Sequence, residues 1–499
     1  MSHIHNKAKP RWMQFAQEFS LPLISGVVVA LCVANLFPNF YHRVVHDSVF
    51  DWLSVEHHPG DAQSELSHDG VLAHGLDHHP VSDHAISDHG PHNSAHSWTH
   101  FFSLHFLVNE LFMVLFFGIA AKEITEACLP GGALNPISRA VNPLFGTIGG
   151  VLGPIFTFLL LNALIGQPDW ANGWGIPTAT DIALAWLAAK FIFGVGHPAI
   201  TFLLLLAVAD DAIGLGIIAI AYPNPNHPTE WINALWIVPG IAIAFGMRKL
   251  DVRNWIPYIT IAGGICWWGL YSAHLHPALA LVFVVPFLPG PKPKKNSLLN
   301  PLHAGENVMQ ALEDDASQHS PLCKFEHDLK AFVDFGLFFF AFANAGVSFA
   351  GMSNLTWILL ASLVVGKTLG ITICSWIGTR MGFPLPPGMD IRHLITAGVI
   401  AGIGLTVALF VSGQAFTDAT VQGAAKMGSL FSAIAFFVAF IVARAMGIRP
   451  ILKMHEHRSS PPIDDKKRIL DTLADEVFEF EHQAVSVESP TDDRRLVNV

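Results

Sequence analysis

The chain has 499 residues, of which 52% are hydrophobic and only 13% are charged, and its mean hydropathy is +0.44. Soluble domains carry roughly a quarter charged residues, so this composition excludes an ordinary soluble enzyme. The formal charge of −11 leaves no basic surface for a nucleic acid. Since a spanning helix needs ~20 apolar residues, we expect an all-α polytopic protein in contact with membrane lipid.

Apolar segments in chain order predict about twelve transmembrane helices. The first, from about residue 20 to residue 40, is longer than the ~7–15 apolar residues of a signal peptide. The others lie near residues 101–128, 142–165, 176–192, 199–221, 231–246, 255–271, 277–289, 330–350, 356–377, 394–412 and 427–447. Lys and Arg gather in alternate loops, which by the positive-inside rule predicts that both termini are cytoplasmic.

Polar stretches divide the chain further. We expect a cytoplasmic N-terminus (1–19), a transmembrane domain (20–449) and a cytoplasmic tail (450–499), which is either disordered or forms a regulatory helix. Within the domain lie a cytoplasmic loop at 290–328 and a His-rich outer insertion at 42–100, which holds 13 of the 27 histidines.

Several basic-poor stretches between apolar segments read as loops, and the positive-inside rule assigns them to the outer side. They cover residues 167–174, 222–231, 272–277, 351–355 and 413–423.

Two adjacent acids lie at the centre of an apolar run. Asp210 and Asp211 occupy the middle of LLLLAVADDAIGLGIIAI, and an ionisable residue inside a membrane segment is expensive, so it indicates an ion pathway or a proton relay. Neighbouring carboxylates also repel and titrate jointly. The alternative is that one acid only pairs with a buried base to hold helices together.

A second polar group interrupts the segment GIPTATDIALAW. Pro177, Thr178 and Thr180 weaken the helix here, and free backbone groups are tolerated at membrane depth only around a polar cavity. Asp181 could ligate a cation, or it could cap the positive N-terminal end of the following helix.

A lysine and two glycines mark the last third of the domain. Lys367, in LVVGKTLGITI, needs a carboxylate partner, for which Asp210 is the obvious candidate, unless its ammonium snorkels to the interface. Gly402 and Gly404 break the span AGIGLTVALF. Interrupted spans at corresponding positions of two halves are typical of a transporter site made from opposed half-helices.

Together these motifs resemble the NhaA-type sodium/proton antiporters. The resemblance rests on ADDAIGLG, TATDIA, FAFANAGVS, VGKTLGI and AGIGLT, which occur in the family's order. Inverted repeats with broken helices are an established feature of that family, so we take them from the resemblance. It implies that helices three to five and ten to twelve are the repeats, with helices four and eleven broken and crossing.

The resemblance also implies roles for site residues. Asp211 would carry the Na⁺ ion and the proton, while Asp210 would alternate between Lys367 and the ion, so that Na⁺ binds at Asp210 and Asp211. Thr180 and Asp181 match the broken fourth helix, where Asp181 would balance the half-helix N-termini and Lys367 the opposing C-termini. The residues that match positions associated with cytoplasmic access and the pH response are Glu123, His276, Glu326 and His327.

The predicted function is a pH-regulated transporter of a bacterial inner membrane that exports Na⁺ and Li⁺ in exchange for H⁺, and the resemblance implies that this exchange is electrogenic. We expect no cofactor and no enzymatic activity, and a homodimer by family resemblance. An intramembrane aspartyl protease would need its two acids on facing helices, whereas Asp210 and Asp211 are adjacent. A metal sensor, or another cation transporter, that uses the His-rich insertion is the remaining alternative, because imidazole binds Zn²⁺, Cu²⁺ and Ni²⁺.

Overall fold

The computed structural model describes residues 20–47, 103–129, 137–223, 229–290 and 320–448, besides Ala16 and Gly132. Residues 1–449 form one compact unit, and residues 450–499 are a separate one. The predictions for the N-terminus, for most of the His-rich insertion, for the centre of the cytoplasmic loop and for the tail lie outside the described residues.

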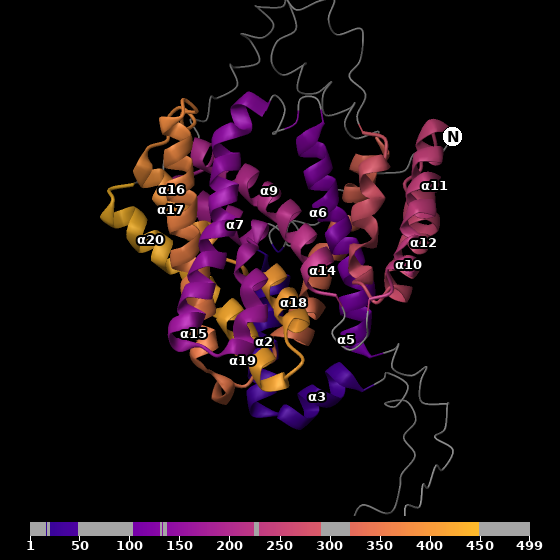
Figure 1. Ribbon diagram of the computed structural model, residues 1–499, viewed down its shortest axis with the longest axis horizontal. Helices are drawn as coiled ribbons and strands as arrows, with labels where there is room; N and C mark the ends of the chain where they lie inside the picture. The colour runs from indigo at the N-terminus through magenta and orange to yellow at the C-terminus, as the bar shows by residue number, and fades with distance from the viewer. Residues whose placement is uncertain are drawn as a thin grey trace, which may run out of the picture. The chain divides into compact units, whose positions relative to one another are not determined.

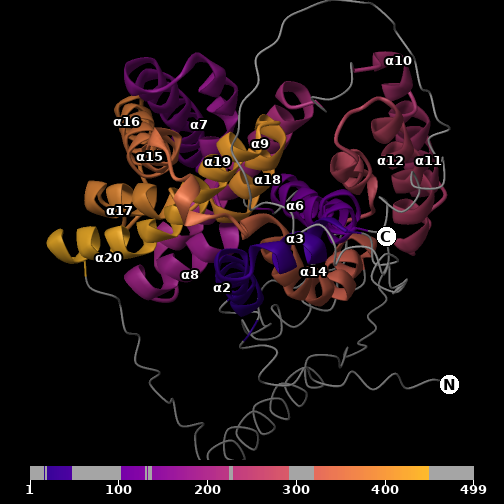
Figure 2. The ribbon, with the colours of Figure 1, turned by 90° about the horizontal axis from the view of Figure 1, so that it is seen from below.

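Every regular element in the described ranges is a helix (Figures 1 and 2); η marks a 3₁₀ or π segment. The elements before residue 225 are α2 (Leu21–Leu36), α3 (Pro38–His46), α5 (Leu104–Phe106), η2 (Leu107–Phe112), α6 (Met113–Cys128), α7 (Ile137–Ile165), η3 (Pro168–Thr178), α8 (Ile182–Phe193) and α9 (Pro198–Ala221). Those that follow are α10 (Trp231–Ala234), α11 (Ile237–Lys249), η4 (Tyr258–Gly263), α12 (Gly264–Ser272), η5 (Pro277–Phe283), η6 (Val285–Phe287), α14 (Pro321–Ala345), η8 (Phe349–Gly351), α15 (Asn354–Ala361), η9 (Ser362–Gly366), α16 (Lys367–Arg380), α17 (Ile391–Ala401), α18 (Leu405–Ala415), α19 (Ala419–Phe431), η10 (Ser432–Ile434) and α20 (Ala435–Ala445).

All twelve predicted apolar segments contain helix. Among the described residues, six single helices are long and apolar enough to cross a membrane, and two bent pairs raise this number to eight. The other four predicted segments correspond to α2, to η4 with α12, to η5 with η6, and to α14. These helices are shorter or, in the case of α14, carry several charges in their first half.

The two broken helices are confirmed. η3 and α8 meet at an angle of 58°, and α17 and α18 meet at 46°. In each half of the chain the bent pair lies between two long spans, which are Ala140–Ile165 and Pro198–Ala221 in the first half and Asn354–Arg380 and Ala419–Ala445 in the second. This repeated order is the one that the family resemblance implies.

Two boundaries differ from the sequence-based expectation. Residues 167–174, predicted to be a loop, mostly belong to η3, which forms the first half of the broken fourth helix. The last span begins at α19, eight residues before the predicted 427, so much of the predicted loop at 413–423 is helical. Gly, Asn, Asp and Pro in these stretches are typical of loops, but the surrounding helices override that local preference.

The helices around the broken pairs pack closely, and α7 lies directly against α16. Figures 1 and 2 show α7, α15 and α16 on one side of the bundle, and α10, α11 and α12 on the opposite side. Small residues let the backbones of α7 and α16 approach. Gly149 and Gly153 on α7 face Gly366 and Gly370 on the partner helix, and each lacks room for a Cβ atom. Such small-xxx-small pairs are a common basis of helix association in membranes.

We expect Gly370→Ala to destabilise the protein by about 1–3 kcal/mol, the usual cost of overpacking, because its Cβ would overlap the carbonyl oxygen of Gly149. Thermal melting in detergent measures the change. Gly264→Ala is the matched control, since a Cβ at this helical glycine meets no atom within 4 Å. Equal melting temperatures of the two variants would contradict the proposed close packing.

Candidate functional site

The predicted partnership of Asp210 and Lys367 is present as a buried ion pair. The Lys367 ammonium donates to Asp210 Oδ2 at 2.6 Å and to the carbonyl oxygen of Thr178 at 2.5 Å. Both side chains are 0% exposed, which excludes snorkelling. The Thr178 carbonyl belongs to the last residue of η3, so Lys367 also compensates the negative end of this half-helix.

A π-helical segment directly precedes Lys367. This segment, η9, ends at Gly366. A π turn inserts one residue into the helical ladder and so redirects the side chains beyond it; such turns are frequent at functional sites.

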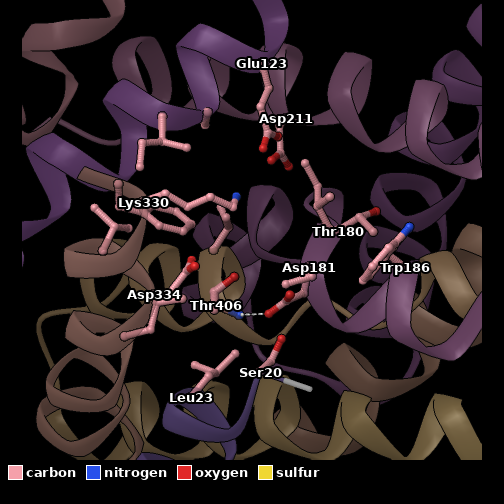
Figure 3. A pocket seen from close by; sticks show the side chains of 18 of the residues that line it. Ser20, Leu23, Glu123, Thr180, Asp181, Trp186, Asp211, Lys330, Asp334 and Thr406 are labelled. Carbon is pink, nitrogen blue, oxygen red and sulfur yellow. Dashed lines mark hydrogen bonds between the residues drawn. The ribbon is translucent and has the colours of Figure 1, made fainter. Parts of the chain in front are cut away.

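Asp211 lines a cavity of about 440 Å³, and Asp210 does not. Residues adjacent on a helix point ~100° apart, so the two carboxylates face different surroundings instead of sharing the cavity. Asp211 Oδ1 is buried and has no hydrogen-bond partner among the described residues. Figure 3 shows the Asp211 carboxylate beside that of Glu123 at one end of the cavity. A carboxylate at the wall of a cavity, with one buried oxygen unpartnered, is a suitable ligand for a small cation.

The breaks of the two bent helices lie against one another. The backbone N–H of Asp181, in the first break, donates to the carbonyl oxygen of Ile403, in the second, at 2.7 Å. The Thr180 hydroxyl lies 2.8 Å from Asp210 Oδ2 and 3.1 Å from the carbonyl oxygen of Ala401, and can donate to either. The broken helices therefore cross next to the ion pair.

The Asp181 carboxylate caps two helices at once. Its Oδ1 accepts from the backbone N–H of Leu184 in α8 at 3.1 Å, and its Oδ2 accepts from that of Thr406 in α18 at 3.3 Å (Figure 3). The N-terminal ends of both half-helices carry partial positive charge, which one carboxylate balances. Asp181 and Thr180 also line the cavity, so capping does not remove Asp181 from the reach of a cation.

We expect Asp181→Ala to destabilise the protein by roughly 1–3 kcal/mol, because each N-cap is worth ~0.5–2 kcal/mol. Asp181→Asn retains one side-chain acceptor and should lose less. Asp418, the exposed N-cap of α19, accepts from Thr420 and Val421 in a single helix, so Asp418→Ala gives the cost of one cap. If Asp181→Ala lowers the melting temperature no more than Asp418→Ala, the double cap contributes nothing extra.

The predicted pH-response residues occupy different surroundings. Glu123 lines the cavity. Glu326 pairs with Lys122, which also pairs with Glu126, and these charges lie where α6 ends and α14 begins. His327 is exposed, with its Nδ1 atom 3.4 Å from Asp328 Oδ1.

His276 lies apart from the other predicted pH-response residues and does not line the cavity. It is buried at the start of η5, where its ring packs edge-on against Phe410 of α18 at a centroid distance of 5.9 Å. The expectation that His276 belongs with the residues of cytoplasmic access and pH response stays a prediction.

Four polar or charged residues of the lining were not selected from the sequence, namely Ser20, Lys330, Asp334 and Thr406. Asp334 lies inside the predicted apolar segment 330–350, so the argument that selected Asp210, that an acid in an apolar segment marks a pathway, would have selected it too. Thr406 contributes a backbone N–H, and no side-chain pattern reveals that.

Known proteins resemble this chain over most of its length. A family profile described as Na⁺/H⁺ antiporter 1 matches residues 84–443. The chain is 49% identical over 435 residues to the Na(+)/H(+) antiporter NhaA of Geobacter sulfurreducens, which covers 87% of this chain and 98% of that protein. It is 48% identical over 439 residues to the NhaA of Desulfitobacterium hafniense, covering 88% and 97%. For the NhaA of a Jannaschia species the identity is 36% over 462 residues, covering 87% and 97%. The chain therefore belongs to the Na⁺/H⁺ antiporter 1 family, as the motifs around Asp210 and Lys367 predicted.

Proposed function

We propose that this chain exchanges Na⁺ for H⁺ across a bacterial inner membrane, with Asp211 as the main carrier of both ions. The observation that carries the proposal is the cavity that ends on the Asp211 carboxylate, beside the Asp210–Lys367 pair. Protons and Na⁺ compete for the same carboxylate oxygens, so a site exposed in turn to each side exchanges one for the other.

Asp210 has a supporting role in this proposal. In the described state its Oδ2 atom is held by Lys367 and Thr180, while Oδ1 is buried and unpartnered among the described residues. An arriving Na⁺ draws Asp210 away from Lys367, and the second carboxylate then completes the oxygen ligands of the ion. Protonation of both aspartates on the return step would move two protons for one Na⁺, so the cycle would carry net charge.

The proposal extends to several finer points. Carboxylate oxygens discriminate poorly between small monovalent ions, so Li⁺ is a further substrate. Glu123, which lies in the cavity with Asp211, and Glu326, which pairs with Lys122, are the candidates for pH regulation. Cytoplasmic termini and a homodimer complete the proposal. The curated relatives are named as antiporters. They lend no support to the metal-sensing alternative, whose His-rich insertion lies largely outside the described residues.

The test is exchange by the purified protein in proteoliposomes with an acidic lumen, followed with a pH-sensitive dye. Added Na⁺ or Li⁺ should dissipate the pH gradient, and a parallel addition of K⁺ measures whether the larger ion is also exchanged. A membrane potential imposed with K⁺ and valinomycin should change the rate of Na⁺ transport if the cycle is electrogenic. Absence of any Na⁺ response across pH would overturn the assignment, and a rate independent of potential would overturn only the stoichiometry.

A further inference from the structure

Helix α14 places a lysine and an aspartate on the wall of the cavity. Lys330 and Asp334 are one helical turn apart, and both line it. Lys330 is the only basic residue among the described residues of the lining. The ionisable residues that share the lining with it are all acids: Glu123, Asp181, Asp211 and Asp334.

The Lys330 ammonium lies among these acids. Figure 3 shows it pointing into the cavity, with Glu123 and Asp211 on one side and Asp334 and Asp181 on the other. Its Nζ atom is also 3.6 Å from Glu326 Oε1, and its side chain is 46% exposed. A long, half-exposed lysine can therefore turn between Glu326 outside the lining and the carboxylates within it.

A fixed ammonium and an arriving Na⁺ have the same charge and seek the same ligands. A Na⁺ ion that enters this cavity to reach the Asp211 carboxylate meets the same acids that surround this ammonium, and at short range inside a protein like charges repel substantially. The opposite charge of Asp334, on the next turn of α14, reduces that repulsion.

We propose that Lys330 is a tethered cation that competes with Na⁺ for the carboxylates of this cavity, and that Asp334 opposes it. The balance of the two residues then sets the apparent affinity for Na⁺. This inference rests on the proposed Na⁺/H⁺ exchange at Asp211. It assigns Lys330 and Asp334 as residues that tune affinity, whereas Asp211 carries the ion.

The structure also argues against a purely structural role for Lys330. Its contact with Glu326 is partly exposed, and exposed ion pairs contribute little to stability. Neutralising Lys330 should therefore leave the fold intact.

The experiment compares the apparent KM for Na⁺ in proteoliposomes at one fixed pH. Lys330→Gln should lower KM about three- to tenfold with Vmax within twofold of wild type, and Lys330→Arg, which keeps the charge, should retain the wild-type KM. Asp334→Asn should raise KM by a similar factor. Lys324→Gln is the matched control, because Lys324 is an exposed lysine of the same helix that does not line the cavity. Calorimetric titration of Na⁺ into the same purified variants measures affinity without transport.

An unchanged KM in Lys330→Gln, or a change no larger than that in Lys324→Gln, would overturn the inference. So would an equal shift in Lys330→Arg, since shape and not charge would then be responsible. If the wild type exchanges Na⁺ while the Lys330 variants match it, only this inference fails. If the wild type shows no Na⁺-dependent exchange, the proposed function fails first.

Discussion

Asp211→Asn should abolish Na⁺-driven proton movement while leaving the protein folded and inserted. An amide keeps the size of the carboxyl group and can still accept hydrogen bonds, but it neither exchanges a proton nor neutralises a cation. The Asp211 carboxylate lies at the end of the cavity with Oδ1 unpartnered among the described residues, so its loss removes the ligand without breaking a described hydrogen bond of that atom. Dye-monitored exchange in proteoliposomes measures the loss of proton movement, and calorimetric titration measures the loss of Na⁺ binding.

The control is Asp169→Asn, at an exposed position near the start of η3. It should exchange Na⁺ at the wild-type rate. Melting temperature and elution profile in detergent should be alike for wild type, Asp169→Asn and Asp211→Asn, which separates loss of transport from loss of folding. If Asp211→Asn exchanges Na⁺ at the wild-type rate, a residue other than Asp211 carries the ions.

Lys367→Ala is expected to have the largest effect on stability, about 3–5 kcal/mol, the usual cost of removing one partner of a buried ion pair. The substitution leaves the buried carboxylate of Asp210 without its counter-ion and the carbonyl oxygen of Thr178 without its donor. Lys367→Arg and Lys367→His keep a base and should be destabilised less. The measurement is thermal melting in detergent.

A double substitution tests whether the unpaired carboxylate of Asp210 causes the loss of stability in Lys367→Ala. If the cost comes from the uncompensated acid, Lys367→Ala combined with Asp210→Ala should recover part of the lost stability, because no buried charge then remains unpaired. Lys249→Ala, at an exposed lysine at the end of α11, should melt like the wild type. A double variant no more stable than Lys367→Ala would show that the ion pair is not the origin of the effect.

Much of the site could be predicted because ionisable residues are rare within apolar membrane-spanning segments and are therefore easy to recognise in the sequence. Asp210, Asp211 and Lys367 each stand within an apolar run, and Pro177 and Gly404 mark the breaks. These are local signals, since a charged or helix-breaking residue in a spanning segment has few structural explanations.

The features of the fold and the site that could not be predicted depend on contacts between distant parts of the chain. The bond from the Thr406 backbone to Asp181 joins residues on different halves of the protein, and a backbone donor leaves no mark in the sequence. η3 reads as a loop because its residues include Pro, Asp, Asn and Gly, and only its packing between α7 and α18 makes it helical. The separation of Asp211, which faces the cavity, from Asp210, which does not, follows from the rotation of α9 in the bundle.

The crossing of the broken helices has a mechanical consequence. The Asp181 N–H bond to Ile403 and the Asp181 carboxylate bond to Thr406 tie one break to the other at backbone level. Sliding one broken helix along the other would break both hydrogen bonds together. These bonds therefore oppose relative sliding of the two broken helices. A motion that opens Asp211 to the opposite side of the membrane must then carry the crossing as one rigid body or displace the helices around it, without bending it at Asp181.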